Sequence, residues 1–129
     1  MTNEDKELLL KDLCSRLPYI PIIQIEEHDW NNLHIDAYDT PFKSYYLEPF
    51  IIGEIEIKPY LRPMSSMTEE EFIQYKCMND ALDENYEVHI DKAYSAFDWL
   101  NEHHFDYRGL IEKGLALKAH EGMYNEKEK

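Results

Sequence analysis

Residues 51–61 read Ile-Ile-Gly-Glu-Ile-Glu-Ile-Lys-Pro-Tyr-Leu, and this stretch decides the fold class. Isoleucines alternate with Glu54 and Glu56, a period of two that places one row of side chains in a core and the other in water. Such a half-buried strand is typical of an antiparallel sheet with one solvated face. The row predicted to be buried comprises Ile51, Gly53, Ile55 and Ile57.

Shorter alternating stretches on both sides of this strand predict the rest of the sheet. Pro21 cannot donate a ladder hydrogen bond, so its strand should be an edge strand or carry a bulge. Short turns between the N-terminal strands suggest a meander. Further strands are expected at about residues 20–25, 33–38 and 45–47, with short extended pieces at 86–90 and 115–117.

The N-terminal segment predicts a helix over residues 3–16. Thr2 or Asn3 can cap its start, and Pro18 ends it. Apolar residues spaced by three or four predict one buried face. That face would contain Leu10, Leu13, Cys14 and Leu17.

A second helix has the clearest start signal in the chain. Thr68 and Glu71 form a capping box, and Met67 and Phe72 occupy the two positions of a hydrophobic staple. We expect this helix to end at about Leu82. Its buried face would contain Ile73, Cys77 and Ala81.

Two short helices are predicted near the C-terminus, over residues 95–104 and 106–113. Asp106 can cap the second of them, and Gly114 fits its left-handed terminator.

Together these elements predict the α+β class. A small antiparallel sheet of three to five strands would pack with an N-terminal helix, a central capped helix and the two short C-terminal helices. A chain of 129 residues favours one domain. We expect residues 1–120 to form it, with residues 121–129 as a frayed tail.

The composition indicates a soluble acidic protein. Hydrophobic residues make up 43% of the chain, too many for intrinsic disorder, and 13 basic against 27 acidic residues give a net charge of −14. Phosphate backbones and anionic membranes attract clustered Lys and Arg, so direct binding to nucleic acid or to a membrane is disfavoured. The chain carries no long apolar run and its start lacks a secretory signal, so a cytoplasmic location is expected.

Cys14 and Cys77 are predicted to be buried free thiols. Each lies on an apolar helical stripe, and neither belongs to a CxxC pair.

Histidines raise the question of a metal site. His34 and Asp36 lie two apart on a strand and share a face, so they could form an open zinc site with His28. Their other interpretation is ordinary decoration of a turn and a strand. His103 and His104 are adjacent on a helix and point about 100° apart, which does not suit a shared ion. No cofactor and no resident metal are therefore predicted.

Three blocks of sequence carry a resemblance. They are KELLLKDLCSRLPY at residues 6–19, IKPYLRPMSSMT at 57–68 and WLNEHHFDYRGLIEKGLA at 99–116. These blocks resemble a family of small uncharacterised proteins carried by gut-bacterial prophages and related mobile elements. The resemblance implies a setting on a mobile element, and it implies no activity and no catalytic residues.

The third block also concentrates Trp99, Phe105, Tyr107 and Arg108. Trp, Tyr and Arg are over-represented at the energetic centres of interfaces, so these residues form either part of the core or a partner-binding patch. Our hypothesis is a non-enzymatic cytosolic accessory protein of a mobile element that binds a host or phage protein. The alternatives are an acidic decoy of a nucleic-acid-binding protein and a small metal-dependent enzyme that uses His28, His34 and Asp36.

Overall fold

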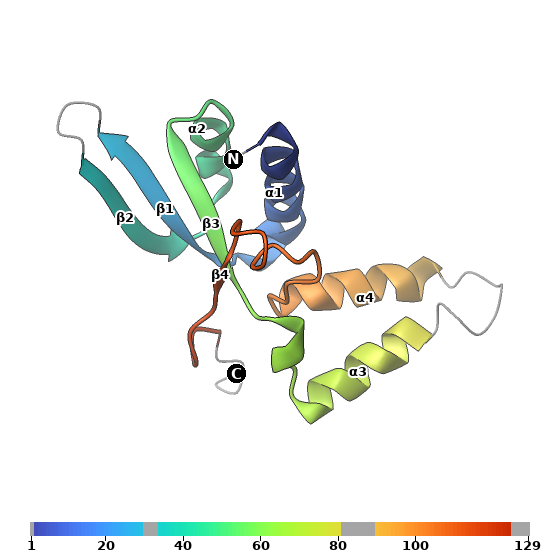
Figure 1. The fold of residues 1–129 in the computed structure, drawn as a ribbon. Helices are drawn as coiled ribbons and strands as arrows, with labels where there is room; N and C mark the ends of the chain where they lie inside the picture. Colours follow the sequence, from blue (N-terminus) through green and yellow to red (C-terminus); the bar gives the residue numbers. More distant parts are fainter. Residues whose placement is uncertain (1, 30–33, 81–89, 125–129) are drawn as a thin grey trace.

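The computed structural model describes residues 2–29, 34–80 and 90–124, without the side chains of residues 28–29, 34–36, 78–80 and 90–95. Figure 1 shows a body, formed by α1, α2 and strands β1–β4, and an arm, formed by α3 and α4, that projects from it. In chain order the elements are α1 (Asn3–Arg16), η1 (Leu17–Tyr19), β1 (Ile22–Asp29), β2 (His34–Pro41), η2 (Ser44–Tyr46), α2 (Leu47–Ile51), β3 (Ile55–Leu61), η3 (Met64–Ser66), α3 (Glu69–Asp80), α4 (Ile90–Glu102) and β4 (Leu117–Lys118).

The sheet has the strand order β2-β1-β3-β4. β1 pairs antiparallel with β2 and β3, whereas β4 pairs parallel with β3, so the sheet is mixed. The predicted α+β class is confirmed. The prediction that Pro21 marks an edge strand or a bulge is wrong, because β1 is central and begins at Ile22, which leaves the missing N–H outside the ladder. The Pro21 carbonyl accepts a hydrogen bond from the Phe42 N–H at 2.8 Å.

η2 and α2 stand where a strand was expected at residues 45–47, and the sheet is not a simple meander. Because β3 pairs with β1, the chain must pass from β2 back to the far side of β1. Pro49 fits the first turn of α2, where its missing N–H has no partner within the helix. Phe50 is buried and anchors this connection, while Ile51, expected inside, is half exposed. Gly53, expected in the strand, has a φ of 86° in the turn that leads to β3.

α1 begins and ends at the predicted residues. The Thr2 hydroxyl oxygen caps it by accepting a hydrogen bond from the Asp5 N–H at 3.0 Å. The predicted buried face is wrong in part: Cys14 is exposed, because the helix turns an ion pair toward the core together with its leucines. The residues of α1 that are buried are Leu9, Asp12, Leu13 and Arg16.

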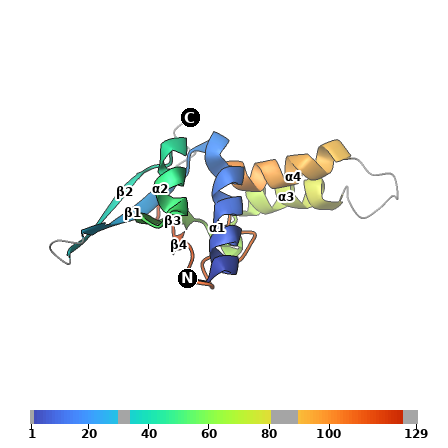
Figure 2. The same cartoon turned by 90° about the horizontal axis from the view of Figure 1, so that it is seen from above.

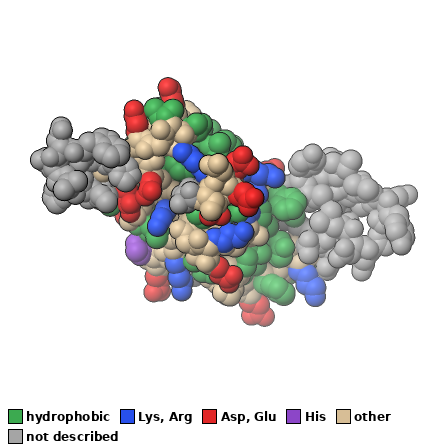
Figure 3. Space-filling view, turned by 45° about the horizontal axis from the view of Figure 1, so that its top comes forward, with side chains coloured by type: hydrophobic (Ala, Val, Ile, Leu, Met, Phe, Trp, Pro, Cys, Tyr) green, Lys and Arg blue, Asp and Glu red, His purple; other side chains and the backbone are tan. Residues whose placement is uncertain are grey.

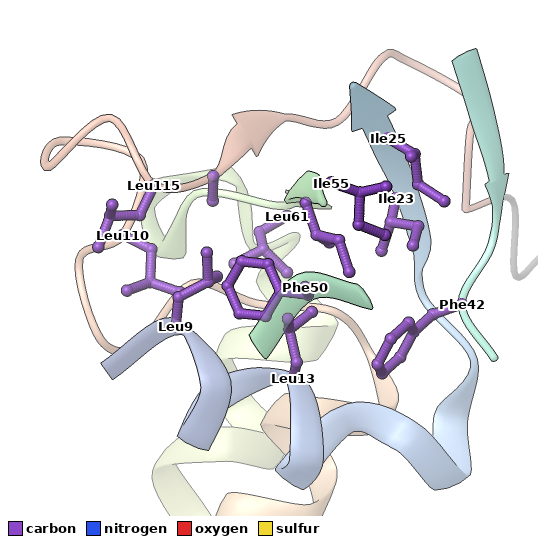
Figure 4. Close-up of a cluster of buried hydrophobic side chains, with 12 residues drawn as sticks. Leu9, Leu13, Ile23, Ile25, Phe42, Phe50, Ile55, Leu61, Leu110 and Leu115 are labelled. Atoms are coloured by element: carbon purple, nitrogen blue, oxygen red, sulfur yellow. The ribbon is translucent and has the colours of Figure 1, made fainter. Parts of the chain in front are cut away.

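The core of the body lies between the sheet and two helices. α1 and α2 cover the same face of the sheet (Figure 2). In Figure 4 the Phe50 ring lies between the leucines of α1 and side chains of the sheet. The buried residues of this cluster are Leu9, Leu13, Ile23, Ile25, Phe42, Phe50, Ile55, Ile57, Leu61, Leu110, Leu115 and Ala116.

In the arm, α3 and α4 run antiparallel and side by side (Figure 1). The predicted capping box is confirmed: the Glu71 N–H donates to the Thr68 hydroxyl oxygen at 3.2 Å, and the Thr68 N–H donates to the Glu71 Oε1 at 2.9 Å. Met67 packs against Trp99 and its neighbours, whereas Phe72 is half exposed.

Two further expectations for the arm differ from the structure. Ile73 and Cys77 were predicted to lie on a buried helical stripe, but both are exposed, because α4 packs on a different side of α3. Ala81, the third residue of that stripe, lies outside the described residues. The short strand expected at residues 86–90 is not present at Ile90, which begins α4, and the other residues of that prediction lie outside the described part.

The C-terminal segment returns to the sheet through turns. Residues 106–114 form turns in place of the second short helix, although the Asp106 carboxylate accepts hydrogen bonds from the backbone N–H groups of Leu110 and Ile111, as a cap would. Within the expected tail, the Tyr124 hydroxyl accepts from the Ile22 N–H and donates to the Tyr60 carbonyl oxygen, both at 2.7 Å. This hydroxyl therefore bridges β1 and β3 just beyond their last backbone pair.

Candidate functional site

Two of the four residues predicted as a partner-binding patch lie inside the protein. Trp99 and Phe105 are buried, with ring centroids 5.7 Å apart, and they form the centre of a second apolar cluster with Leu100. The indole N–H of Trp99 donates to the Gln74 side-chain oxygen at 3.3 Å. This cluster joins the base of the arm to the body.

The other two residues, Tyr107 and Arg108, are half-buried and take part in an internal ionic network. Asp12 is fully buried and accepts from the Nε of Arg16 at 2.8 Å and from the Nε of Arg108 at 3.0 Å. Arg16 also donates to the Phe105 carbonyl oxygen at 2.7 Å. The polar groups of this network therefore hold α1 against the C-terminal segment.

The histidines near the end of α4 have separate surroundings. His103 packs against Trp99 with the rings tilted and their centroids 4.4 Å apart, and its Nδ1 lies 4.0 Å from a Glu71 oxygen. His104 is buried, and its ring stacks on Tyr124 at a centroid distance of 3.8 Å. His104 also has a φ of 63°, in the left-handed position that ends a helix by a Schellman motif.

The proposed metal ligands His28, His34 and Asp36 cannot be placed by their side chains, which lie outside the described residues. Their backbone register pairs His28 with Ile35 rather than with either of the other two. Among the residues that are described, no group of three His, Cys, Asp or Glu side chains could hold a metal ion. Both cysteines are free, and both are exposed, so the prediction of burial is wrong for Cys14 and Cys77.

A cleft of about 690 Å³ lies at the base of the arm. Its central feature is a bidentate ion pair between Arg62 and Glu71, at 2.8 and 2.6 Å. Burial raises the pKa of the Glu71 carboxyl, but the hydrogen bonds from Arg62 and Thr68 outweigh it and hold the pKa below its ordinary value. The cleft is lined by Arg62, Pro63, Ser66, Thr68, Glu70, Glu71, Gln74, His103, Lys118, Ala119, His120, Glu121, Gly122 and Tyr124.

Sequence reasoning did not find this cleft, since it joins three segments that lie far apart in the chain: residues 62–74, His103 and residues 118–124. The capping box identified Glu71 as a local helix signal, and nothing in the spacing of Arg62 pointed to it as the partner. Because Arg62 and Glu71 neutralise each other, they give the centre of the cleft no unpaired charge with which to select a ligand.

The outer face of α3 carries exposed apolar side chains among the described residues of the arm. Phe72 and Ile73 are 53% and 56% exposed, and Cys77 lies one turn beyond Ile73. None of the residues of α3 whose burial is described is buried, in contrast to α1. The space-filling view shows hydrophobic side chains gathered between the body and the end of the arm, with acidic side chains spread over the rest of the visible face (Figure 3).

The sequence signal for this surface was the apolar stripe itself. The periodicity of Ile73 and Cys77 correctly identified the two residues as one face of a helix, but it could not tell whether that face meets the protein's own core or another molecule.

Comparisons with known proteins found no matching family model, no matching curated protein and no matching solved structure. In the part of the chain that the structure describes, every helix is too short or too polar to cross a bilayer.

Proposed function

We propose that this protein is a non-enzymatic, cytoplasmic accessory protein of a mobile element, and that it binds a host or phage protein through the outer face of α3. The observation that carries the binding is the exposure of Phe72 and Ile73 on a helix that follows a core-like periodicity. The resemblance of three sequence blocks to proteins of mobile elements supports the setting.

The energetics favour this surface as a contact. Full burial of an exposed Phe or Ile side chain is worth about 1.5–3 kcal/mol, and because Phe72 and Ile73 are already about half buried, each can contribute about half of that to a complex. An amphipathic helix that lays such residues into an apolar groove is a recurrent mode of recognition. Glu69 and Glu70 at the start of α3 are exposed, so the partner's groove should carry basic residues at the end that meets them.

The test is capture from extracts of the host by the tagged full-length chain, compared with two variants. Ile73→Glu places a charge in the proposed contact. Ile52→Glu is the matched control, since Ile52 is also exposed and apolar but lies after α2 in the body. We expect one partner to be retained by the wild type and by Ile52→Glu and lost with Ile73→Glu. A partner that Ile73→Glu retains would contradict the proposal.

The two natural cysteines supply a second readout. Once the partner is purified, its binding should slow alkylation of Cys77 on α3 and leave Cys14 on α1 reactive, because both thiols are exposed in the free chain. Equal alkylation of Cys77 with and without partner would overturn the assignment to α3. Binding should also persist when salt is raised, whereas the acidic-decoy alternative predicts that the complex dissociates.

A further inference from the structure

The sheet has two outer strands, the eight-residue β2 and the two-residue β4. β2 pairs only with β1 (Figure 1). Its residues Ala37, Tyr38, Asp39 and Pro41 are exposed. An edge strand presents unpaired N–H and C=O groups, and it is a template on which an extended chain can add.

A row of acidic side chains leads to this edge on the outer face of the sheet. The register places Glu56 of β3 directly opposite Glu26 of β1, and Glu26 directly opposite Ala37 of β2. Directly opposed residues share a face, and like charges in such a pair destabilise a sheet. Because Ala37 is short, it leaves the two carboxylates accessible from beyond the edge.

The other face of the same edge is aromatic. Tyr38 is directly opposite Ile25, so it belongs to the side of the sheet that covers the core, and it is 39% exposed. Its hydroxyl donates to Glu27 at 2.9 Å, which fixes the ring beside the strand. Tyr45 in η2 is 66% exposed and stacks at a tilt on Tyr46, with centroids 4.5 Å apart.

We propose that β2 accepts an extended basic segment of a partner protein as an added strand. A Lys or Arg of that segment would reach across Ala37 to Glu26, with the charge of Glu56 behind it, and the alternate residues would be apolar and contact Tyr38. This surface is separate from α3 and goes beyond the function proposed above, so either can fail without the other. A second copy of this chain is a poor occupant, because each copy carries a net charge of −14 and would repeat the same acidic row.

The probe is a short acetylated and amidated peptide in which lysine and valine alternate, titrated into the full-length protein by calorimetry. In an added strand, only every second peptide N–H points at β2. N-methylation of one alternate set should therefore weaken binding about tenfold, while methylation of the other set should leave it nearly unchanged. Equal losses for both sets, or no binding of the unmodified peptide, would overturn the proposal.

Side-chain variants test the charge argument. Glu26→Gln with Glu56→Gln should weaken peptide binding several-fold more than the control Glu4→Gln with Glu7→Gln, which changes the net charge equally on α1. Ala37→Lys would place a cation beside Glu26 from within the chain, so it should raise the thermal midpoint and abolish peptide binding. A thermal midpoint that falls, or peptide affinity that is unchanged in these variants, would contradict the proposed row.

The oligomeric state gives the remaining outcome. We expect a monomer in sedimentation at low and high salt. A dimer of the free protein that Ala37→Lys dissociates would assign the edge to a second copy and overturn the proposal of a basic partner.

Discussion

The helix α1 of the body and the helix α3 of the arm are packed in opposite ways. In the body, α1 turns two leucines and an ion pair inward against the sheet. The core of the body contains residues from both helices and from β1 and β3. In the arm, α3 packs on α4, and none of its residues with described burial is buried. The body's packing can therefore carry the stability of the fold, and the arm can present apolar side chains to another molecule.

The ion pairs of the two regions also differ in burial, with the pair in the body more deeply buried. The side chains of Asp12 and Arg16 are 0% exposed, whereas those of Arg62 and Glu71 at the base of the arm are 18% and 15% exposed. A fully buried charge has no water to replace a lost partner, so the pair in the body should be far more sensitive to removal of one member.

The largest effect is expected in the body. Asp12→Ala leaves Arg16 buried without its carboxylate and removes a partner of Arg108, so the free energy of unfolding should fall by about 3–5 kcal/mol. Chemical denaturation measures this loss, with the exposed Glu112→Ala as a control of equal charge change. The paired change Asp12→Leu with Arg16→Met should cost less than Asp12→Ala alone. A loss below that of Glu112→Ala would contradict the importance of the network.

Local signals in the sequence were sufficient for the parts of the fold that local physics determines. Thr2 and Pro18 set the ends of α1, the Thr68–Glu71 capping box set the start of α3, and alternation identified Ile55 and Ile57 as inward residues. In each case the contacts that decide the structure lie within a few residues of one another.

The remaining features depend on long-range packing. An Asp and an Arg four residues apart, as in Asp12 and Arg16, are usual on an exposed helix face. Their burial comes from the return of the C-terminal segment to α1, where the Phe105 carbonyl contacts Arg16 and the Arg108 guanidinium contacts Asp12. The spacing of Ile73 and Cys77 is that of a buried helical face, yet both are exposed because no other segment of the described chain packs on that face of α3. For this reason the predicted patch of Trp99 and Phe105 lies in the core that connects the arm to the body, whereas Phe72 and Ile73 lie on the surface.

A smaller and pH-dependent effect is expected at the base of the arm. Glu71→Gln keeps the shape of the capping side chain but removes its charge, so the free energy of unfolding should fall by about 1 kcal/mol near neutral pH. Because the folded state holds the pKa of Glu71 below its ordinary 4.5, the wild type gains this stability above that value. The gain should disappear as the pH falls through the lower pKa of the folded state, so the two proteins should converge in acid.

Thr68→Ala is the control for this pH dependence. It removes the hydroxyl that caps the same helix and should cost about 1 kcal/mol, while Arg62 and Glu71 remain. Most of its loss should therefore persist in acid. If the difference between wild type and Glu71→Gln stayed constant from neutral pH to acid, the ion pair would not be the source of the stability.

The smallest change in stability is expected at two non-glycine residues with left-handed backbone conformation. One ends η1 in the body, and the other ends α4 in the arm. Ile20 follows η1 in the body and has a φ of 47°, while His104 follows α4 and has a φ of 63°. This conformation costs a residue with a Cβ about 1–2 kcal/mol, which glycine avoids at a cost of about 0.5–1 kcal/mol in chain entropy.

The side chains decide which substitution gains. Ile20 is about half exposed, so Ile20→Gly should raise the free energy of unfolding by about 0.5 kcal/mol, because little packing is lost. His104→Gly removes a ring stacked on Tyr124, an interaction of about 0.5–1.5 kcal/mol, so it should give no gain. Denaturation midpoints of both variants measure the difference. If Ile20→Gly lowered the midpoint while His104→Gly raised it, the strain would lie in the connection to the arm, and the body would depend on Ile20 for packing.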